Sequence, residues 1–336
     1  MLELYVGSEG NFSTISEAIH AVPYHTKAIV YIAEGIYEEK IFCEKKNITL
    51  IGAGPDKTII RWADYALKDH SDGRKFGTFR SYTAFFAGRV VTVKDLSILN
   101  TSGDNKLVGG AIAAYVDTEV ASFHNVHFDS YQNTLFCAPL PDSERENGDF
   151  FGPRAYVPPK ASFGFYYNCK ISGNIDFIFG GGDVLFYECQ IRSKLADHNE
   201  IGYISAPSGK KEGAGFMFTK CQFFSLNCAK GSVYLARPWR VEGKTTLLNC
   251  YLDEHIHEEG WSTGHFDDRL ETNFRMTFSE FESYGPGANQ AKRVKWAKLL
   301  DFEASRELNE RIEYAAKAWG IDDTQSKIEK IAKKSF

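Results

Sequence analysis

The sequence predicts an all-β fold built as a solenoid, in which short strands of one chain stack in successive coils. Two observations carry this prediction: a six-residue strand pattern returns along the middle of the chain, and cysteine recurs at one position of that pattern. The length of 336 residues agrees with it. It exceeds the roughly 100–200 residues of a usual compact domain, but in an elongated solenoid each coil buries its own part of the core.

The strand pattern has the form apolar, any residue, polar, Cys or Val, any residue, apolar. Alternation with a period of two is typical of a strand with one buried face. Successive cysteines of the pattern, at positions 169, 189, 221 and 250, lie 20, 32 and 29 residues apart. Short strands that recur roughly every 20–30 residues indicate solenoid coils. Copies of the pattern occupy residues 123–128, 166–171, 186–191, 218–223 and 247–252.

The cysteines also bear on the compartment. Seven is an odd number, and the sequence holds no Cys-x-x-Cys pair. We expect free thiols in a reducing, cytoplasmic compartment rather than a disulfide framework. A metal site is the alternative, and the absence of a close pair argues against it. The cysteines are Cys43, Cys137, Cys169, Cys189, Cys221, Cys228 and Cys250.

Both ends of the chain carry helical patterns. Thr14 and Glu17 form a capping box that predicts a helix over residues 15–22, and Pro23 ends it. Such a helix would cap the open end of the first coil. From Ala288 onward the pattern turns helical, so we expect a β-helix domain over 1–290 and a helical tail over 291–336 packed on it. Candidate apolar positions of the tail are Trp296, Leu299, Leu300, Leu308, Ile312, Ala315 and Trp319.

Composition excludes some partners. A net charge of -5 gives no reason to expect nucleic acid, although a local basic groove can still bind an acidic polymer. The sequence shows neither a leader pattern at its start nor a run of about 18 apolar residues, so we expect no membrane association. We expect a monomer.

One long stretch, residues 138–164, interrupts the repeat. It holds five prolines among mixed charges and therefore predicts a loop that leaves the solenoid. Loops of this length inside compact domains are usually functional or mobile.

Asp176 is the first candidate for chemistry. It lies in the apolar strand pattern of residues 175–179, where an ionised carboxylate is costly unless it is paired. Arg237 is the natural partner from a later coil. A structural salt bridge is the alternative interpretation of this pair.

Together, these motifs resemble the pectin methylesterase (pectinesterase) family. The most specific ones are GNIDFIFG at 173–180 and RPW at 237–239, and the resemblance extends over most of residues 1–288. It implies a single-stranded right-handed parallel β-helix, a pectin-lyase-like solenoid. We expect a bacterial, cytoplasmic-type member. Further matching segments are residues 6–12, 14–18, 35–39, 78–81, 132–135, 260–261 and 284–287.

The resemblance also implies a chemistry: hydrolysis of galacturonate methyl esters without metal or cofactor, as in pectin degradation and cell wall modification. Asp176 would attack the ester and form an acyl-enzyme, with Arg237 holding it ionised and oriented. Gln132 would stabilise the oxyanion. The expected partner is a pectin-derived oligogalacturonide. Substrate contacts are expected from Thr78, Gly110, Phe179, Trp239 and Trp261.

Two site positions depart from the family pattern. Asn133 stands where the family has an aspartate that protonates methanol and then activates water, and Gly110 stands where it has a second glutamine. General acid–base help is worth about 10²–10⁴-fold and one oxyanion donor about 10²–10³-fold. Carboxylates of the long loop are candidates for a replacement acid: Glu144, Glu146 and Asp149.

Three interpretations follow. The chain is a slow or specialised esterase, including one for a better leaving group such as a thiolate, whose reference pKa is roughly 8.5. Alternatively, it binds oligogalacturonide without cleaving it. A lyase or glycosidase is the third, but no calcium-binding or closely spaced carboxylate cluster is visible.

Overall fold

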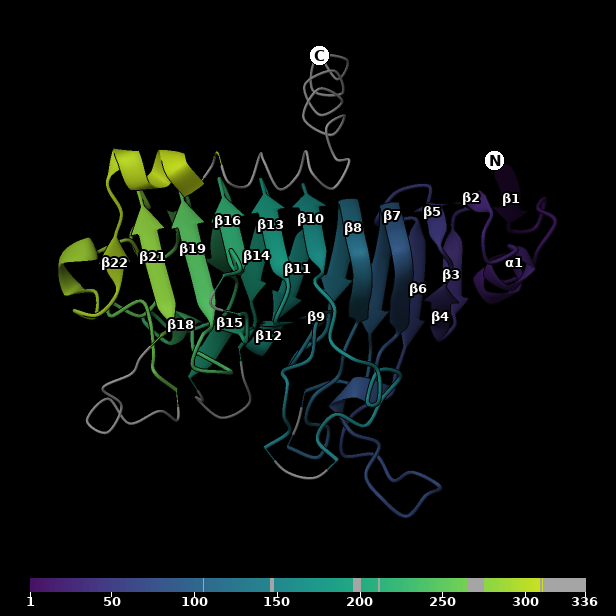
Figure 1. Cartoon of the computed structure of the whole chain (residues 1–336), viewed down its shortest axis with the longest axis horizontal. Coiled ribbons are helices and arrows are strands. Elements are labelled where there is room, and N and C mark those ends of the chain that lie inside the picture. Colours follow the sequence, from purple (N-terminus) through teal and green to yellow (C-terminus); the bar gives the residue numbers. More distant parts are fainter. Residues whose placement is uncertain are drawn as a thin grey trace. The chain divides into compact units, whose positions relative to one another are not determined.

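The computed structural model describes residues 1–104, 106–145, 148–195, 201–210, 212–264, 275–308 and 310. The chain divides into two compact units, Met1–Lys298 and Leu299–Phe336. The first unit is a parallel β-helix, as predicted: strands of successive coils pair in parallel and stack into three faces (Figure 1). The long strands β7 (Ala84–Asn100) and β8 (Ala114–Asp129) pair along nearly their whole length and bend through all three faces.

The three faces are defined by their strands. The first face holds β1 (Leu2–Val6), β2 (Lys27–Ile32), β5 (Asn47–Ile51), β10 (Phe163–Tyr167), β13 (Asp183–Tyr187), β16 (Phe216–Thr219), β19 (Lys244–Leu248) and β21 (Thr277–Phe281). The second face holds β3 (Gly35–Glu38), β6 (Thr58–Trp62), β11 (Lys170–Gly173), β14 (Gln190–Ser193), β17 (Gln222–Ser225) and β20 (Tyr251–Leu252). The third face holds β4 (Ile41–Glu44), β9 (Leu135–Cys137), β12 (Ile175–Gly180), β15 (Gly202–Pro207) and β18 (Val233–Ala236).

The structure explains each position of the sequence repeat. Its first, apolar position forms an inward stack of rings, with centroids of Phe123 and Tyr166 4.8 Å apart and those of Phe186 and Phe218 4.6 Å apart. Its polar position turns the corner from the first face to the second with a left-handed backbone. Asn tolerates that conformation better than most residues, but Glu and Lys adopt it here too. These corner residues, with φ between 50° and 54°, are Asn125, Asn168, Glu188, Lys220 and Asn249.

The cysteine position of the repeat points inward, directly after each corner. The Cys189 thiol donates to the Tyr166 carbonyl at 3.2 Å, and the Cys250 thiol donates to the Phe218 carbonyl at 3.3 Å. Each of these hydrogen bonds reaches the preceding coil, so the thiol groups find their hydrogen-bond acceptors within the core. All seven cysteines are free, which confirms the prediction of free thiols instead of a disulfide framework.

The predicted N-terminal helix is present as α1 (Ile15–Ala21), and its capping box forms in both directions between Thr14 and Glu17. Ile15, Ala18 and Ile19 are buried in the same apolar core as the first coils. The helix lies beside β1 at the N-terminal end of the solenoid (Figure 1).

The expectation of a continuous helix from Ala288 is wrong. The chain makes one 3-10 turn, η3 (Gln290–Lys292), then runs without helix to the short strand β22 (Lys298–Leu299), and residues 302–308 are helical. The cause is tertiary: the Trp296 ring packs 5.9 Å from that of Phe278, and Arg293 is drawn into a buried ion pair, so the segment follows the core surface. Ile312, Ala315 and Trp319 lie outside the described residues. The packing of the tail and its boundary at residue 290 stay predictions.

A buried histidine gives this fold a pH dependence. His255 is 2% exposed, and its Nε2 lies 3.2 Å from Ser193 Oγ. Burial lowers the pKa of His255 to about 4, although the nearby negative charge of Asp253 acts to raise this pKa. The unfolded chain therefore binds a proton at this imidazole near pH 6.5, but the folded chain binds it only near pH 4. The contribution of His255 to the free energy of unfolding is therefore complete above about pH 6.5 and is lost as the pH falls from about 6.5 to about 4.

We expect the free energy of unfolding to fall by about 2 kcal/mol more between pH 7 and pH 5 in the unaltered chain than in His255→Gln. Urea unfolding at both pH values measures this difference. His20→Gln, at an exposed position of α1, serves as the control and should keep the pH dependence of the unaltered chain. An equal change in the free energy of unfolding between pH 7 and pH 5 in the unaltered chain and in His255→Gln would contradict the assignment of this pH dependence to His255.

Candidate active site

A pocket of about 250 Å³ lies on the outside of the third face. Several outward side chains of this face are aromatic, and two segments cover them: residues around η1 (Thr78–Arg80) and the loop after β9. The lining therefore combines rings from the strands with charged groups from the loops. It consists of Thr78, Phe79, Asn133, Arg145, Asp149, Phe150, Asp176, Phe179, Ala206, Arg237, Pro238 and Trp239.

Asp176 and Arg237 form a two-pronged ion pair in this pocket. Arg237 Nε donates to Asp176 Oδ1 at 2.8 Å, and Arg237 Nη2 donates to Asp176 Oδ2 at 2.7 Å. Each side chain keeps 19% of its surface exposed, so the carboxylate is both fixed and reachable. Such bidentate pairing fixes the plane of a carboxylate as well as its position.

The backbone of β12 is irregular where it presents this carboxylate. The register with β15 shifts between Ile175 and Ile178, and Asp176 has a left-handed φ of 46°. A bulge of this kind re-aims a side chain, and residues in such conformations cluster at functional sites. This irregularity turns the Asp176 side chain toward the pocket. It explains how a charged residue can lie within the apolar sequence of this strand.

Arg237 is supported from its other side. Its guanidinium lies 4.0 Å from the centre of the Tyr203 ring, which stacks on Tyr234 at 5.7 Å. Burial lowers the pKa of Arg237, but its hydrogen bonds and charge interaction with Asp176 outweigh this and raise it above the usual value. The cation is therefore permanent and preorganised.

Asn133 lies beside Asp176, on the turn before β9. It has a left-handed φ of 64°, and its Nδ2 donates to the main-chain oxygen of Asp176 at 3.3 Å. Its side chain lines the pocket, so the structure brings this position to the site as expected. An amide has no proton to give at neutral pH, so position 133 supplies hydrogen bonds only.

Gly110 lies against the same group of side chains. A Cβ there would stand 2.8 Å from Thr78 Oγ1 and 2.9 Å from Asn133 Oδ1. No side chain fits at position 110 unless Thr78 or Asn133 moves. Positions 78, 110 and 133 are therefore packed against one another, and Thr78 and Asn133 occupy the room that a side chain at position 110 would need.

Two predicted site residues lie elsewhere. Trp261 is 1% exposed and stacks on Phe278 at 5.2 Å inside the core, so the prediction that it contacts substrate is wrong. Its bridge to Ala236 holds the ring on the inner side of the coil. Gln132 is half-buried in the turn before Asn133, and it is not among the residues that line the pocket. Its oxyanion role stays a prediction.

The aromatic wall of the pocket is built from four side chains. Trp239 is half-buried and lies 5.6 Å from Phe179 and 6.2 Å from Phe150, measured between ring centres. Phe179 is only 3% exposed and forms the floor, with Phe79 beside it. Trp239 therefore exposes a larger fraction of its surface than the three phenylalanine rings of this wall.

The long loop turns out to be part of the site. Arg145 Nη2 donates to the Trp239 carbonyl at 2.8 Å, and Arg240 Nη2 donates to the Ser143 carbonyl at 3.0 Å. These bonds hold the loop over the pocket, where it contributes Arg145, Asp149 and Phe150. Sequence reasoning assigned no role to Arg145 and Phe150. The only signal was a proline-rich loop that starts directly after the Gln132–Asn133 motif.

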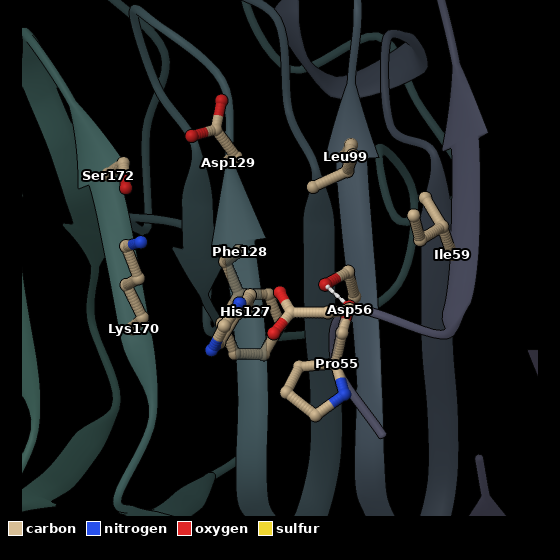
Figure 2. A pocket seen from close by; sticks show the side chains of 10 residues that line it. Pro55, Asp56, Ile59, Leu99, His127, Phe128, Asp129, Lys170 and Ser172 are labelled. Carbon is tan, nitrogen blue, oxygen red and sulfur yellow. Dashed lines mark hydrogen bonds between the residues drawn. The ribbon is translucent and has the colours of Figure 1, made fainter. Parts of the chain in front are cut away.

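Another pocket, of about 270 Å³, lies on the second face between β6, β7, β8 and β11 (Figure 2). Lys170, Asp56 and Asp129 give it mixed charge, and burial together with Lys170 lowers the pKa of His127. It shares no residue with the first pocket. Throughout the described part of the chain, no group of three or more His, Cys, Asp or Glu residues could hold a metal ion.

Fold and site together define a class: a parallel β-helix protein with an arginine-paired aspartate in an aromatic pocket on one face. The pectinesterase family model matches residues 5–143 and 156–319, and the chain belongs to this family. Members of the family are carboxylic ester hydrolases.

Curated relatives and solved structures agree with this assignment. The chain is 34% identical over 300 residues to a probable pectinesterase/pectinesterase inhibitor 12 of Arabidopsis thaliana, covering 85% of this chain and 48% of that protein. It is 31% identical over 308 residues to pectinesterase/pectinesterase inhibitor PPE8B of Prunus persica, covering 88% and 53%. The chain thus spans about half the length of these relatives.

Among solved structures, pectin methylesterase PemA of Erwinia chrysanthemi superimposes with a TM-score of 0.74 at 25% identity, over 91% of this chain and 95% of that one. An aspartate-to-alanine mutant of a pectin methylesterase in complex with a hexasaccharide superimposes with a TM-score of 0.75 at 25% identity, over the same shares. None of the helices described here is long and apolar enough to span a membrane.

Proposed function

We propose that this protein hydrolyses methyl esters of galacturonate oligomers, with Asp176 as the nucleophile. The observation that carries the proposal is the Asp176–Arg237 pair, held with both oxygens fixed and still exposed to the pocket. Membership in a family of ester hydrolases and the likeness to a pectin methylesterase crystallised with a hexasaccharide support it.

The reaction runs in two halves. Asp176 attacks the ester carbonyl carbon, and the intermediate collapses to an acyl-enzyme as the C–O bond to the methoxy group breaks; the methoxide takes a proton from solvent water and leaves as methanol. Water then attacks the acyl carbon and regenerates the Asp176 carboxylate. Arg237 keeps the carboxylate oriented in both halves, and the Gln132 amide stabilises the oxyanion.

The surroundings of the pocket suit an acidic sugar chain. Arg145 lines it, and the Arg240 guanidinium lies 5.0 Å from the Trp239 ring at its edge. The Trp239 face can stack on a sugar ring while the guanidinium groups attract neighbouring carboxylates.

We further propose that the protein is cytoplasmic, and the seven free thiols support this location. A cytoplasmic enzyme would act on short imported fragments rather than on pectin of the cell wall.

Methanol release from methylated oligogalacturonides by the purified protein tests the proposed function. Oligomers without methyl esters are the control for background methanol. Release that depends on methylation is the expected result. Binding of both oligomers without any release would show a carbohydrate-binding relative instead, and release of thiol from a thioester without release of methanol would show an esterase for better leaving groups.

The crowding at position 110 gives a prediction for the same assay. Gly110→Ala places a methyl group against Thr78 and Asn133, and a displacement of about 1 Å at a site can cost 10²-fold in rate. We expect kcat/KM for methanol release to fall by up to about 10²-fold. Gly209→Ala is the matched control, because a Cβ there meets only the Gly181 carbonyl, at 3.9 Å. Unchanged kcat/KM in Gly110→Ala would show that Thr78 and Asn133 need not hold their positions.

A further inference from the structure

We propose that Tyr203 is a positioning residue of this site: its ring holds the Arg237 guanidinium in the orientation that clamps Asp176. The effect on the rate of ester hydrolysis rests on the proposed function. Tyr203 is not among the residues that line the pocket, but the centre of its ring lies only 4.0 Å from the Arg237 guanidinium.

The strand order explains why Arg237 needs support. β15 pairs with β12 on one side and with β18 on the other. Arg237 follows β18 directly, and its amide donates to the Ser205 carbonyl of β15 at 3.0 Å. Its guanidinium must therefore cross β15 to reach Asp176 on β12, a span of two strand spacings or roughly 10 Å. A long side chain that reaches so far has many competing rotamers, and fixing one of them costs entropy.

Tyr203 lies in the middle of this span. It is the partner of Ile175, the residue before Asp176, and its amide donates to the Asn174 carbonyl at 3.0 Å. Its side chain is half-buried between two buried neighbours of β15, so it points to the outer surface that carries the ion pair. A cation is attracted to an aromatic face, and the attraction strengthens where water is excluded. The ring therefore favours the rotamer that carries the guanidinium of Arg237 to Asp176.

A stack of outward rings on the following coils holds Tyr203 in turn. The rings of Tyr203 and Tyr234 are 5.7 Å apart and inclined by 13°, and the Tyr234 ring lies 4.3 Å from that of His257. The Tyr234 hydroxyl donates to Glu259 Oε2 at 3.2 Å. A group that positions a catalytic pair needs such locked support. The series of contacts therefore runs from Glu259 through the rings to the Arg237 guanidinium.

A positioning role and a purely structural role of Tyr203 differ in what a substitution does. Leucine keeps an apolar side chain at the surface of β15 but removes the aromatic face. Phenylalanine keeps the face and removes only the hydroxyl. If the ring orients the guanidinium, these two substitutions have different effects on the reaction, whereas a ring that only covers the strand affects stability.

Kinetics with methylated oligogalacturonide test the assignment. In Tyr203→Leu we expect kcat for methanol release to fall by about 10–10²-fold, because a displacement of about 1 Å at a site can cost 10²-fold. KM and the unfolding midpoint should stay near those of the unaltered chain. Tyr203→Phe should keep kcat within about threefold, because phenylalanine also presents an aromatic face to the cation.

Tyr167→Leu is the matched control. Tyr167 is also half-buried and stacks on an outward tyrosine of the next coil, Tyr187, at 6.1 Å, but it belongs to the first face. The same loss of an outward ring should therefore leave kcat unchanged there.

Hydrogen exchange reads the orientation of Arg237 without any substrate. With isotope-labelled arginine, the exchange rate of the Arg237 Nε–H proton reports its hydrogen bond to Asp176 Oδ1, which is 2.8 Å long. The signal is assigned from its loss in Arg237→Lys. We expect exchange about 10-fold faster in Tyr203→Leu than in the unaltered chain, and an unchanged rate in Tyr203→Phe.

Each outcome decides. A lower kcat and faster exchange in Tyr203→Leu, both restored by phenylalanine, support the assignment. It is overturned if Tyr203→Leu keeps either the kcat or the exchange rate of the unaltered chain, if Tyr203→Phe loses as much as Tyr203→Leu, or if kcat falls together with the unfolding midpoint. If the unaltered chain releases no methanol, the proposed function fails, and the exchange rates alone decide the role of Tyr203.

Discussion

Asp176→Ala is expected to abolish methanol release from methylated oligogalacturonides, with a fall in kcat on the order of 10⁴–10⁶-fold. The reason is that alanine removes the atom that bonds to the substrate, and among the residues that the structure describes Asp176 is the carboxylate that Arg237 holds. Initial rates of methanol formation at saturating oligomer measure the effect. Because the side chain lies at an irregular point of β12, the change should not disturb the inward residues of that strand, Phe177 and Ile178, which are fully buried.

Affinity provides the control for this variant. An enzyme that loses its nucleophile should still bind oligogalacturonide through Trp239 and the arginines at the edge of the pocket, so calorimetry should show binding near that of the unaltered chain. Methanol release above one tenth of the normal rate by Asp176→Ala would contradict the role of Asp176.

Arg293→Met is expected to lower the free energy of unfolding by about 3–5 kcal/mol, since it leaves the Glu280 carboxylate buried without its partner. The two side chains are 3% and 1% exposed, and Arg293 Nε donates to Glu280 Oε1 at 2.6 Å. Arg293 also donates to the carbonyls of Glu258 at 3.0 Å and Gly287 at 2.9 Å. One side chain thus joins the last coil to the segment that follows it. Urea unfolding followed by circular dichroism measures the loss.

The neighbouring Lys292 offers a matched control. It pairs with Glu258 at 2.6 Å, but both side chains are more than half exposed. Exposed pairs contribute little to stability, so Lys292→Met should leave the unfolding midpoint unchanged. A similar shift in both variants would show that burial of the Arg293–Glu280 pair is not the cause.

The sequence predicted most of the solenoid because every coil repeats the same physical requirements. The cysteine register, the polar corner and the capping box each depend on contacts within a short segment or on the equivalent position of the next coil. The Asp176–Arg237 pair was predictable for a related reason: a carboxylate in an apolar strand needs a partner, and a motif on a later coil supplied one.

The rest depended on contacts that no local pattern records. The segment around Trp296 has a helical pattern but follows the core surface instead, because Arg293 is drawn to Glu280. Trp261 was expected at the substrate and is buried, since the register of its bridge to Ala236 decides which side of the coil it faces. The loop that carries Asp149 folds back over the pocket through bonds to main-chain oxygens, and such bonds leave no signature in side-chain sequence.

The most direct test of the central claim is the mass of the Asp176 peptide during turnover. The protein is mixed with a nitrophenyl ester of an oligogalacturonide, quenched with acid within the nitrophenol burst, digested and analysed by mass spectrometry. We predict an acyl adduct on the peptide that contains Asp176, in an amount that matches the burst, and none in Asp176→Ala. A burst of one equivalent per chain with the Asp176 peptide unmodified would contradict the aspartyl mechanism.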